Sequence, residues 1–409
     1  MEHLAVVGGK AAHPSQHFDA LDSLRGICAC MIVLFHLRST GIVTNAALVQ
    51  HGWMFVDFFF VLSGFVIGCG YLERLGSGYS VRRFMLLRLG RIYPLHLAVL
   101  LALLALEIAG ALVGTGGLSA RAPFAEPRTL PALASSLALV QIFAGYPNIV
   151  WNGPSWSIAA EIWTYLLVAL VLRAMPSRGL WLVAGLAAGA ALFLFLAGPS
   201  AWDPATAYAF ARCVLGFSIG LLAWALFSST GKPALGFAMA SLLELAAVTC
   251  CVAMVAAGGL PLLAPLLFGG SVFLFAAEGG AVSRLLKTRP FTLVGSLSYS
   301  IYMIHTLVLA RGLDALAVAG RLVHRPLVDT AFGAGGTVKV LTFAPDLLAF
   351  VLLGVVILCA AATYRWIETP ARDASRRWLS RAPLAPSMPL AAGRRALGEA
   401  ESIATTAAA

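Results

Sequence analysis

The chain has 409 residues, of which 60% are hydrophobic and 11% are charged, and its mean hydropathy is +0.88. This balance excludes a water-soluble globular protein, because such a protein needs a largely polar surface. The net charge of +10 would suit a nucleic-acid binder, but the basic residues lie at the ends of apolar segments, so we expect them to orient the chain in a lipid bilayer and to bind no nucleic acid.

The predicted elements are apolar runs of about 20 residues, the length that crosses a bilayer as a helix. Residues 1–17 come first and lack the basic start and apolar run of a signal peptide, so we expect a flexible segment followed by a retained first span. Ten candidate spans follow, at residues 22–41, 53–71, 93–113, 155–173, 180–198, 207–227, 236–257, 260–278, 292–312 and 346–366. They predict an all-α, polytopic membrane bundle of about ten transmembrane helices.

The stretch at residues 130–143 is apolar but short, and poor helix formers follow it. With ten spans, the basic loops and the Arg-rich tail all fall on the side of the N-terminus, which is the pattern of cytoplasmic loops. An eleventh crossing at 130–143 would invert every later loop. We therefore expect residues 115–154 to form an outer-side loop that dips into the membrane, and both termini to be cytoplasmic.

One membrane domain at residues 18–373 accounts for all the spans, without an internal repeat. Residues 374–409 are rich in Ala, Pro, Ser and Arg and predict a disordered cytoplasmic tail. The seven cysteines lie in apolar runs without the paired spacing of a metal site, so no metal is expected. The oligomeric state is left open by the sequence.

Ionisable residues inside the spans are the first candidates for function, because charge in a membrane is costly. On the first span, Arg25 and His36 are eleven positions apart, which returns to nearly the same helix face about 16 Å further along. The predicted topology brings His36 level with Asp57, Glu161 and His305 on other spans. An imidazole beside carboxylates suits a general base that removes the proton of a hydroxyl.

Each of these residues also has a structural interpretation. A single His in an apolar helix is more often a packing residue, and Asp57 and Glu161 would serve equally as hydrogen-bond partners that hold helices together. Arg212, within the sixth predicted span, has no evident role except to pair with one of these carboxylates.

On the inner side, Arg88 and Arg91 are three residues apart and share a helix face, and Pro94 follows at a position suited to starting a helix. Two guanidinium groups beside a helix N-terminus would bind phosphate. The spacing alone favours the alternative, a basic anchor that contacts anionic lipid head groups.

Six segments of the chain form an ordered set. They are Leu21 to Gly26 leading to His36; Val56 to Phe65; Arg88 to Pro94; Pro154 to Glu161; Ser296 to Tyr302 with His305; and Glu368 to Pro370. In this order they resemble the bacterial membrane acyltransferase 3 family, which includes the O-antigen acetylases, and they cover about residues 18–373. Each segment is weak alone, whereas the ordered set is specific.

The resemblance implies a ten-span protein of the bacterial inner (plasma) membrane that moves an acyl group, usually acetyl, from acyl-CoA to a hydroxyl of a carbohydrate or glycolipid acceptor. No cofactor is expected beyond acyl-CoA as the donor substrate. The predicted catalytic residues are His36 as base, with Asp57 and Glu161. The predicted substrate-binding residues are Arg25, Ser63, Arg88, Arg91, Trp156, Ser157, Tyr299 and His305.

Two alternatives from other classes stay open. Intramembrane Asp, Glu and His also build proton relays, so a proton-coupled transporter or flippase of a cell-envelope metabolite would fit the same residues. A non-enzymatic scaffold would leave the aligned ionisable groups unexplained. Within the enzyme hypothesis, direct transfer to the acceptor is simplest, and a transient acyl group on His36 or Ser63 is the alternative.

Overall fold

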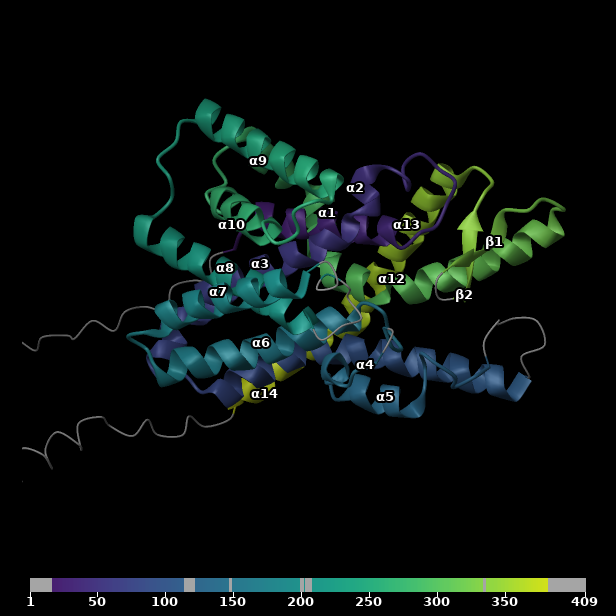
Figure 1. Cartoon of the computed structure of the whole chain (residues 1–409), viewed down its shortest axis with the longest axis horizontal. Coiled ribbons are helices and arrows are strands. Elements are labelled where there is room, and N and C mark those ends of the chain that lie inside the picture. Colours follow the sequence, from purple (N-terminus) through teal and green to yellow (C-terminus); the bar gives the residue numbers. More distant parts are fainter. Residues whose placement is uncertain are drawn as a thin grey trace, which may run out of the picture.

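The computed structural model describes residues 17–113, 122–146, 149–198, 202, 208–333 and 336–381. These residues form a bundle of helices with one small β-hairpin (Figure 1). The α-helices are α1 (Asp19–Phe35), α2 (Ala47–Gln50), α3 (Phe55–Gly76), α4 (Val81–Val113), α5 (Leu130–Leu137), α6 (Ser155–Ala174), α7 (Gly179–Ala197), α8 (Tyr208–Thr230), α9 (Phe237–Ala257), α10 (Ala264–Phe275), α11 (Ala281–Leu286), α12 (Arg289–Leu322), α13 (Pro345–Thr363) and α14 (Thr369–Arg381). Short 3-10 turns η1 (Gly52–Met54) and η2 (Gln141–Phe143), a π-helical turn η4 (Tyr364–Glu368) and strands β1 (Val328–Gly333) and β2 (Gly336–Leu341) complete the described part.

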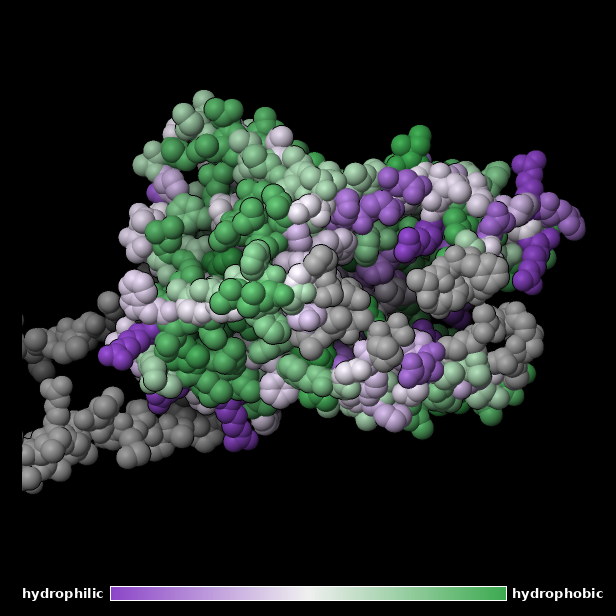
Figure 2. All heavy atoms as spheres, in the orientation of Figure 1, coloured by the Kyte–Doolittle hydropathy of each residue, from purple (hydrophilic) through white to green (hydrophobic). Residues whose placement is uncertain are grey.

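Eight of the described helices are long and apolar enough to cross a membrane, which confirms the predicted all-α, polytopic fold. Shorter helices stand at the first and eighth predicted spans, α1 with 17 residues and α10 with 12. Apolar side chains cover the face over α7, α8 and α9, whereas hydrophilic side chains gather at the two ends of the long axis (Figure 2). This distribution is the one expected of a protein whose middle faces lipid.

Residues 130–143 do not cross the bundle. They contain only α5, whose 8 residues rise about 12 Å, and the turn η2. Both are tied to the bundle, since the Trp163 indole donates to the Leu139 carbonyl at 2.8 Å and the Tyr93 hydroxyl donates to the Leu137 carbonyl at 2.9 Å. The irregular backbone is therefore packed against protein, which is the condition for a loop at membrane depth.

Glycines bring α3 and α8 together at the centre of the bundle. A Cβ atom at Gly64 would lie 1.9 Å from the carbonyl oxygen of Phe217, and one at Gly68 would lie 2.8 Å from the side chain of Trp224. Only glycine permits the first approach, and small residues commonly bring membrane helices this close. Because the contacts advance in the same direction along both sequences, the two helices are parallel.

A second glycine contact joins α1 to α12. A Cβ atom at Gly26 would lie 2.6 Å from the backbone nitrogen of Gly295, and one at Gly295 would lie 2.6 Å from the carbonyl oxygen of Asp22. The two backbones therefore touch directly. This contact places the polar residues that flank Gly26 and Gly295 side by side, which prepares the site described below.

The start of α4 differs from the prediction. The helix begins at Val81 and Pro94 lies inside it, so the expectation that Pro94 starts a helix beside Arg88 and Arg91 is wrong. Proline removes one backbone N–H from a helix and strains the turn before it. Here α6, α12 and α14 pack along α4, and such tertiary contacts outweigh a local penalty.

The hairpin β1–β2 is antiparallel, with Val328 opposite Leu341. Its second strand is joined to the loop that follows α1, because the Leu341 N–H donates to the Arg38 carbonyl and the Thr40 N–H donates to the Leu341 carbonyl, both at 3.0 Å. The hairpin therefore lies at the same end of the bundle as the end of α1.

The opposite end is rich in arginine, and we call it the basic end. It contains the last turn of α3, the first turn of α4 and the last turn of α14. Arg83 on α4 donates to the carbonyl of Leu379 on α14 at 2.9 Å. Residues 374–381 of the expected disordered tail are thus helical. The remainder of that tail and residues 1–16 of the expected flexible segment lie outside the described residues.

Candidate active site

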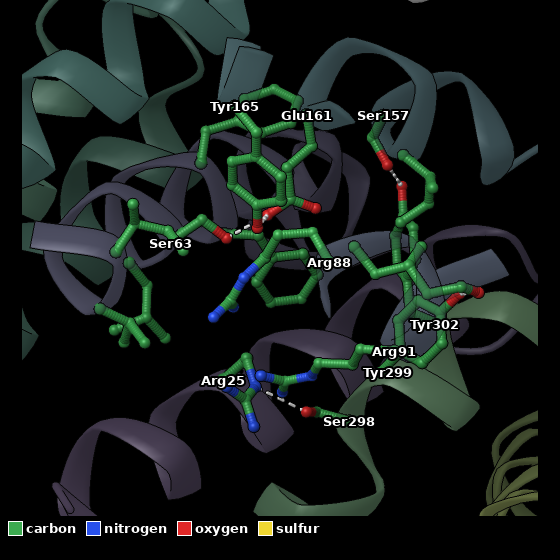
Figure 3. A pocket seen from close by; sticks show the side chains of 17 residues that line it. Arg25, Ser63, Arg88, Arg91, Ser157, Glu161, Tyr165, Ser298, Tyr299 and Tyr302 are labelled. Carbon is green, nitrogen blue, oxygen red and sulfur yellow. Dashed lines mark hydrogen bonds between the residues drawn. The ribbon is translucent and has the colours of Figure 1, made fainter. Parts of the chain in front are cut away.

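A cavity of about 110 Å³ lies where α1, α3, α4, α6 and α12 meet (Figure 3). Its lining combines basic, acidic, hydroxyl and apolar side chains from all five helices. These are Arg25, Phe59, Phe60, Leu62, Ser63, Val66, Ile67, Arg88, Arg91, Ile92, Ser157, Ile158, Glu161, Tyr165, Ser298, Tyr299 and Tyr302.

Three guanidinium groups form one wall of the cavity (Figure 3). Arg25 donates from Nε to the Ser298 hydroxyl at 2.7 Å, across the glycine contact between α1 and α12. Arg88 lies over the ring of Tyr71, 4.9 Å from its centroid, and its buried Nε has no hydrogen-bond partner among the described residues. The like charges of Arg25 and Arg88 repel that of Arg91, and the carboxylates of Glu368 and Asp22 offset part of this repulsion, the second through its ion pair with Arg25 at 2.9 Å. A bound polyanion would relieve this repulsion.

A carboxylate with two hydroxyl groups forms the facing wall. Glu161 and Tyr165 are four residues apart on α6 and share its inner face, so that the Tyr165 hydroxyl donates to Glu161 at 2.5 Å. Ser63 reaches across from α3 and donates to the same carboxylate oxygen. Figure 3 shows Ser63, Glu161 and Tyr165 converging at one point above Arg88.

Phe59 and Tyr302 close the cavity on the side towards the end of α1, and we call them the aromatic partition. Both line the cavity, and their ring centroids are 5.5 Å apart. The Tyr302 hydroxyl is hydrogen-bonded to the Ser157 hydroxyl at 2.8 Å. The ring of Tyr302 is also 5.8 Å from the ring of His305, so one side chain separates the cavity from that histidine.

His36 and His305 form a pair beyond the aromatic partition. His36 is the residue at which α1 ends, and its Nδ1 lies 3.3 Å from Nε2 of His305 and 2.9 Å from the Ile32 carbonyl oxygen. Nδ1 of His305 lies 2.6 Å from the Tyr302 carbonyl oxygen. His305 is fully buried, whereas the side chain of His36 is exposed. His36 thus lies at the surface of the bundle, against a buried histidine.

Asp57 does not lie beside either histidine; it forms a buried ion pair with Arg212. Nη2 of Arg212 is 2.9 Å from Oδ2 of Asp57, Nε is 3.2 Å from Oδ1, and both side chains are 1% exposed. The rings of Trp53, Trp156 and Trp202 surround the guanidinium, with centroids 5.3 to 5.4 Å away. The structure therefore does not place Asp57 beside His36, as the predicted alignment of His36 with two carboxylates requires. It confirms the predicted pairing of Arg212 with a carboxylate.

The predicted residues separate into three places. The cavity holds seven of them, namely Arg25, Ser63, Arg88, Arg91, Ser157, Glu161 and Tyr299. His36 and His305 form the pair beyond the aromatic partition. Asp57 and Trp156 belong to the ion pair and its tryptophan cage. Among the described residues, no group of three His, Cys, Asp or Glu side chains could hold a metal ion.

Sequence reasoning missed Tyr165, Ser298 and Tyr302, which line the cavity. The four-residue spacing of Glu161 and Tyr165 could have identified the first. Sequence reasoning also assigned no role to Glu368. This buried residue accepts a hydrogen bond from the Ser300 hydroxyl at 2.8 Å and interacts electrostatically with Arg91. Glu368 follows the last predicted span, and only the packing of η4 against α4 and α12 brings it to the arginines.

Comparison with known proteins gives a family and two relatives. The family model described as "Acyltransferase domain" matches residues 18–366. Acyltransferase MdmB of Streptomyces mycarofaciens is 36% identical over 149 residues, which is 34% of this chain and 34% of that protein. Protein 2 in picA locus of Rhizobium radiobacter is 35% identical over 88 residues, which is 21% of this chain and 44% of that protein. The chain thus matches less than half the length of either relative, and no solved structure matches it significantly.

Proposed function

Because the chain belongs to the acyltransferase family whose domain model matches residues 18–366, we propose that it moves an acyl group, acetyl in the first instance, from acyl-CoA to a hydroxyl of a carbohydrate or glycolipid acceptor. The coarser statement, a membrane acyltransferase, follows from the family and from the apolar helices. The observation that carries the finer proposal is the cavity in which three guanidinium groups face a carboxylate, with a histidine pair beyond one aromatic partition.

The donor occupies the cavity from the basic end. Arg25, Arg88 and Arg91 bind its diphosphate, since guanidinium groups form strong charge-assisted hydrogen bonds with phosphate oxygens. The buried Nε of Arg88, which lacks a partner among the described residues, would gain one. The thioester end then points towards the aromatic partition. In this proposal the basic end faces the cytoplasm of a bacterial cell, where acyl-CoA is found, as the positions of the arginines favour.

His36 serves as the base, and its hydrogen bonds select the reactive nitrogen. Nδ1 of His305 faces a carbonyl oxygen, so it carries a proton and leaves Nε2 of that ring as an acceptor. Nδ1 of His36 must then carry the proton that faces Nε2 of His305 and the Ile32 carbonyl. These assignments, made from the hydrogen-bond network, leave the lone pair of the His36 Nε2 free to accept a proton.

The transfer step is direct. The acceptor oxygen bonds to the acyl carbon while its proton passes to Nε2 of His36; the carbon–sulfur bond then breaks, and the proton is returned to the CoA thiolate. The ring of Tyr302 has to move aside for the thioester to meet His36. Asp57, engaged with Arg212, holds α3 to α8 in this scheme and takes no part in the proton transfer.

The test is acyl transfer by the purified protein in lipid, followed as release of free thiol from acetyl-CoA with a fractionated extract of cell-envelope glycans. The native chain should need the extract, and His36→Ala should lose at least about a hundredfold in rate, the usual worth of a general base, while it remains folded. Near-normal turnover by folded His36→Ala would refute the assignment of the base. No turnover with acyl-CoA of any chain length would refute the donor.

A further inference from the structure

The cavity continues beyond its arginines along one face of α3. Ser63, Ile67, Gly70 and Arg74 follow one another at steps of three or four residues, which places them on one face of the helix. From Ser63 to Arg74 this face runs about 16 Å towards the basic end. The first two residues line the cavity.

Open space accompanies this face. A Cβ atom at Gly70 would meet nothing within 4 Å, so there is open space beside α3 at this position. Val66 lines the cavity and is also 36% exposed, which marks the point where the cavity opens outwards. An extended chain leaving the cavity would therefore pass Val66 and Gly70.

Arginine and tyrosine side chains alternate at the end of this path, and we call them the Tyr–Arg ladder: Arg88, Tyr71, Arg74 and Tyr79. Arg88 and Arg74 lie 4.9 and 5.1 Å from the ring centroid of Tyr71, and Arg74 lies 4.2 Å from that of Tyr79. Arg88 belongs to the cavity as well, so the ladder begins inside the donor site and ends on the surface, where Arg74 is exposed.

We propose that the Tyr–Arg ladder binds the nucleotide end of the donor, with the adenine ring stacked on a tyrosine or guanidinium plane and the ribose 3′-phosphate on Arg74. Aromatic rings and guanidinium planes are the common stacking surfaces for nucleobases. Guanidinium groups also bind phosphate with two parallel hydrogen bonds. The ladder offers a stacking surface and a phosphate-binding guanidinium at one place, and the open face of α3 connects the ladder to the cavity. This inference rests on the proposed function, since it assigns the other half of the same donor.

The test separates nucleotide binding from catalysis. Binding of 3′-phospho-ADP, the nucleotide half of coenzyme A, is measured by titration calorimetry on the full-length protein in detergent. Native protein should bind it; Arg74→Ala and Tyr71→Leu should weaken binding at least about tenfold, whereas Tyr71→Phe, which keeps the ring, should bind as native. Lys232→Ala is the matched control: α8 is parallel to α3, so Lys232 lies at the same end of the bundle, outside the ladder, and its loss removes the same charge.

Kinetics with two donors supply the second readout. The same two weakened variants should raise the KM for acetyl-CoA with little change in kcat, and should leave the kcat/KM of S-acetylpantetheine, which has no nucleotide, unchanged. No nucleotide binding by native protein, equal binding by all variants, or equal losses with both donors would overturn the inference. If the nucleotide binds as stated but no donor is turned over, the ladder stands and the proposed acyl transfer fails.

Discussion

The buried ion pair between Asp57 and Arg212 allows structure to be separated from chemistry. Asp57→Leu removes two hydrogen bonds, at 2.9 and 3.2 Å, and leaves a guanidinium with 1% exposure unpaired. Breaking a buried pair from one side costs about 3–5 kcal/mol. Changing Arg212→Met as well removes the stranded charge, so the double variant should recover most of that loss. It should stay below native by about 1–2 kcal/mol, because the guanidinium also stacks on tryptophan rings.

Denaturant unfolding in detergent, followed by tryptophan fluorescence, measures both variants, and Trp53, Trp156 and Trp202 report directly from around Arg212. The double-mutant cycle isolates the coupling between the two changes. A double variant no more stable than Asp57→Leu alone would refute the pairing argument. Turnover per folded molecule in the double variant should stay within a few-fold of native; a folded but inactive double variant would return Asp57 to the reaction.

Three further substitutions test the packing, the donor wall and the partition. Gly64→Ala would place a methyl group 1.9 Å from the Phe217 carbonyl oxygen, so we expect the variant to lose its native thermal transition, and a normal transition would contradict the tight α3–α8 contact. Arg88→Ala should raise the KM for acyl-CoA about ten- to a hundredfold, the value of one charge-assisted hydrogen bond, with a smaller rise for Arg88→Lys; equal KM values would return Arg88 to a lipid-anchor role. Tyr302→Ala should raise thiol release without acceptor, because water gains access to the thioester, and an unchanged background rate would show that the partition does not exclude it.

The membrane fold was predictable because about 20 apolar residues have few alternatives in lipid. The cavity arginines were predictable as functional candidates as well. Arg25, Arg88 and Arg91 stand at the ends of apolar runs, where charge is tolerated. Pro94 shows the limit of local rules: its helix-breaking tendency was overridden by three helices packed along α4, and no local pattern reports such contacts.

Partners distant in sequence were the other limit. Asp57 and Arg212 are 155 residues apart, and His36 and His305 are 269 apart. Ordering ionisable groups by depth brought the histidines to one level but could not tell which helices are neighbours. The contacts that decide it are those of Gly64 with α8 and of Gly26 with α12, and a glycine in a helix does not reveal its partner from sequence alone.

The aromatic partition also bears on the ion gradients of a membrane that holds such a protein. Under the proposed function, a polyanion enters from one face and a sugar from the other, and such a protein must keep protons from crossing between the two faces. Here the ring of Tyr302, whose hydroxyl is hydrogen-bonded to that of Ser157, lies between the cavity and His305. If the acyl group of the donor fills the space that the Tyr302 ring leaves, an apolar group occupies this position throughout acyl transfer. The barrier to proton leakage is then kept at every step of the transfer.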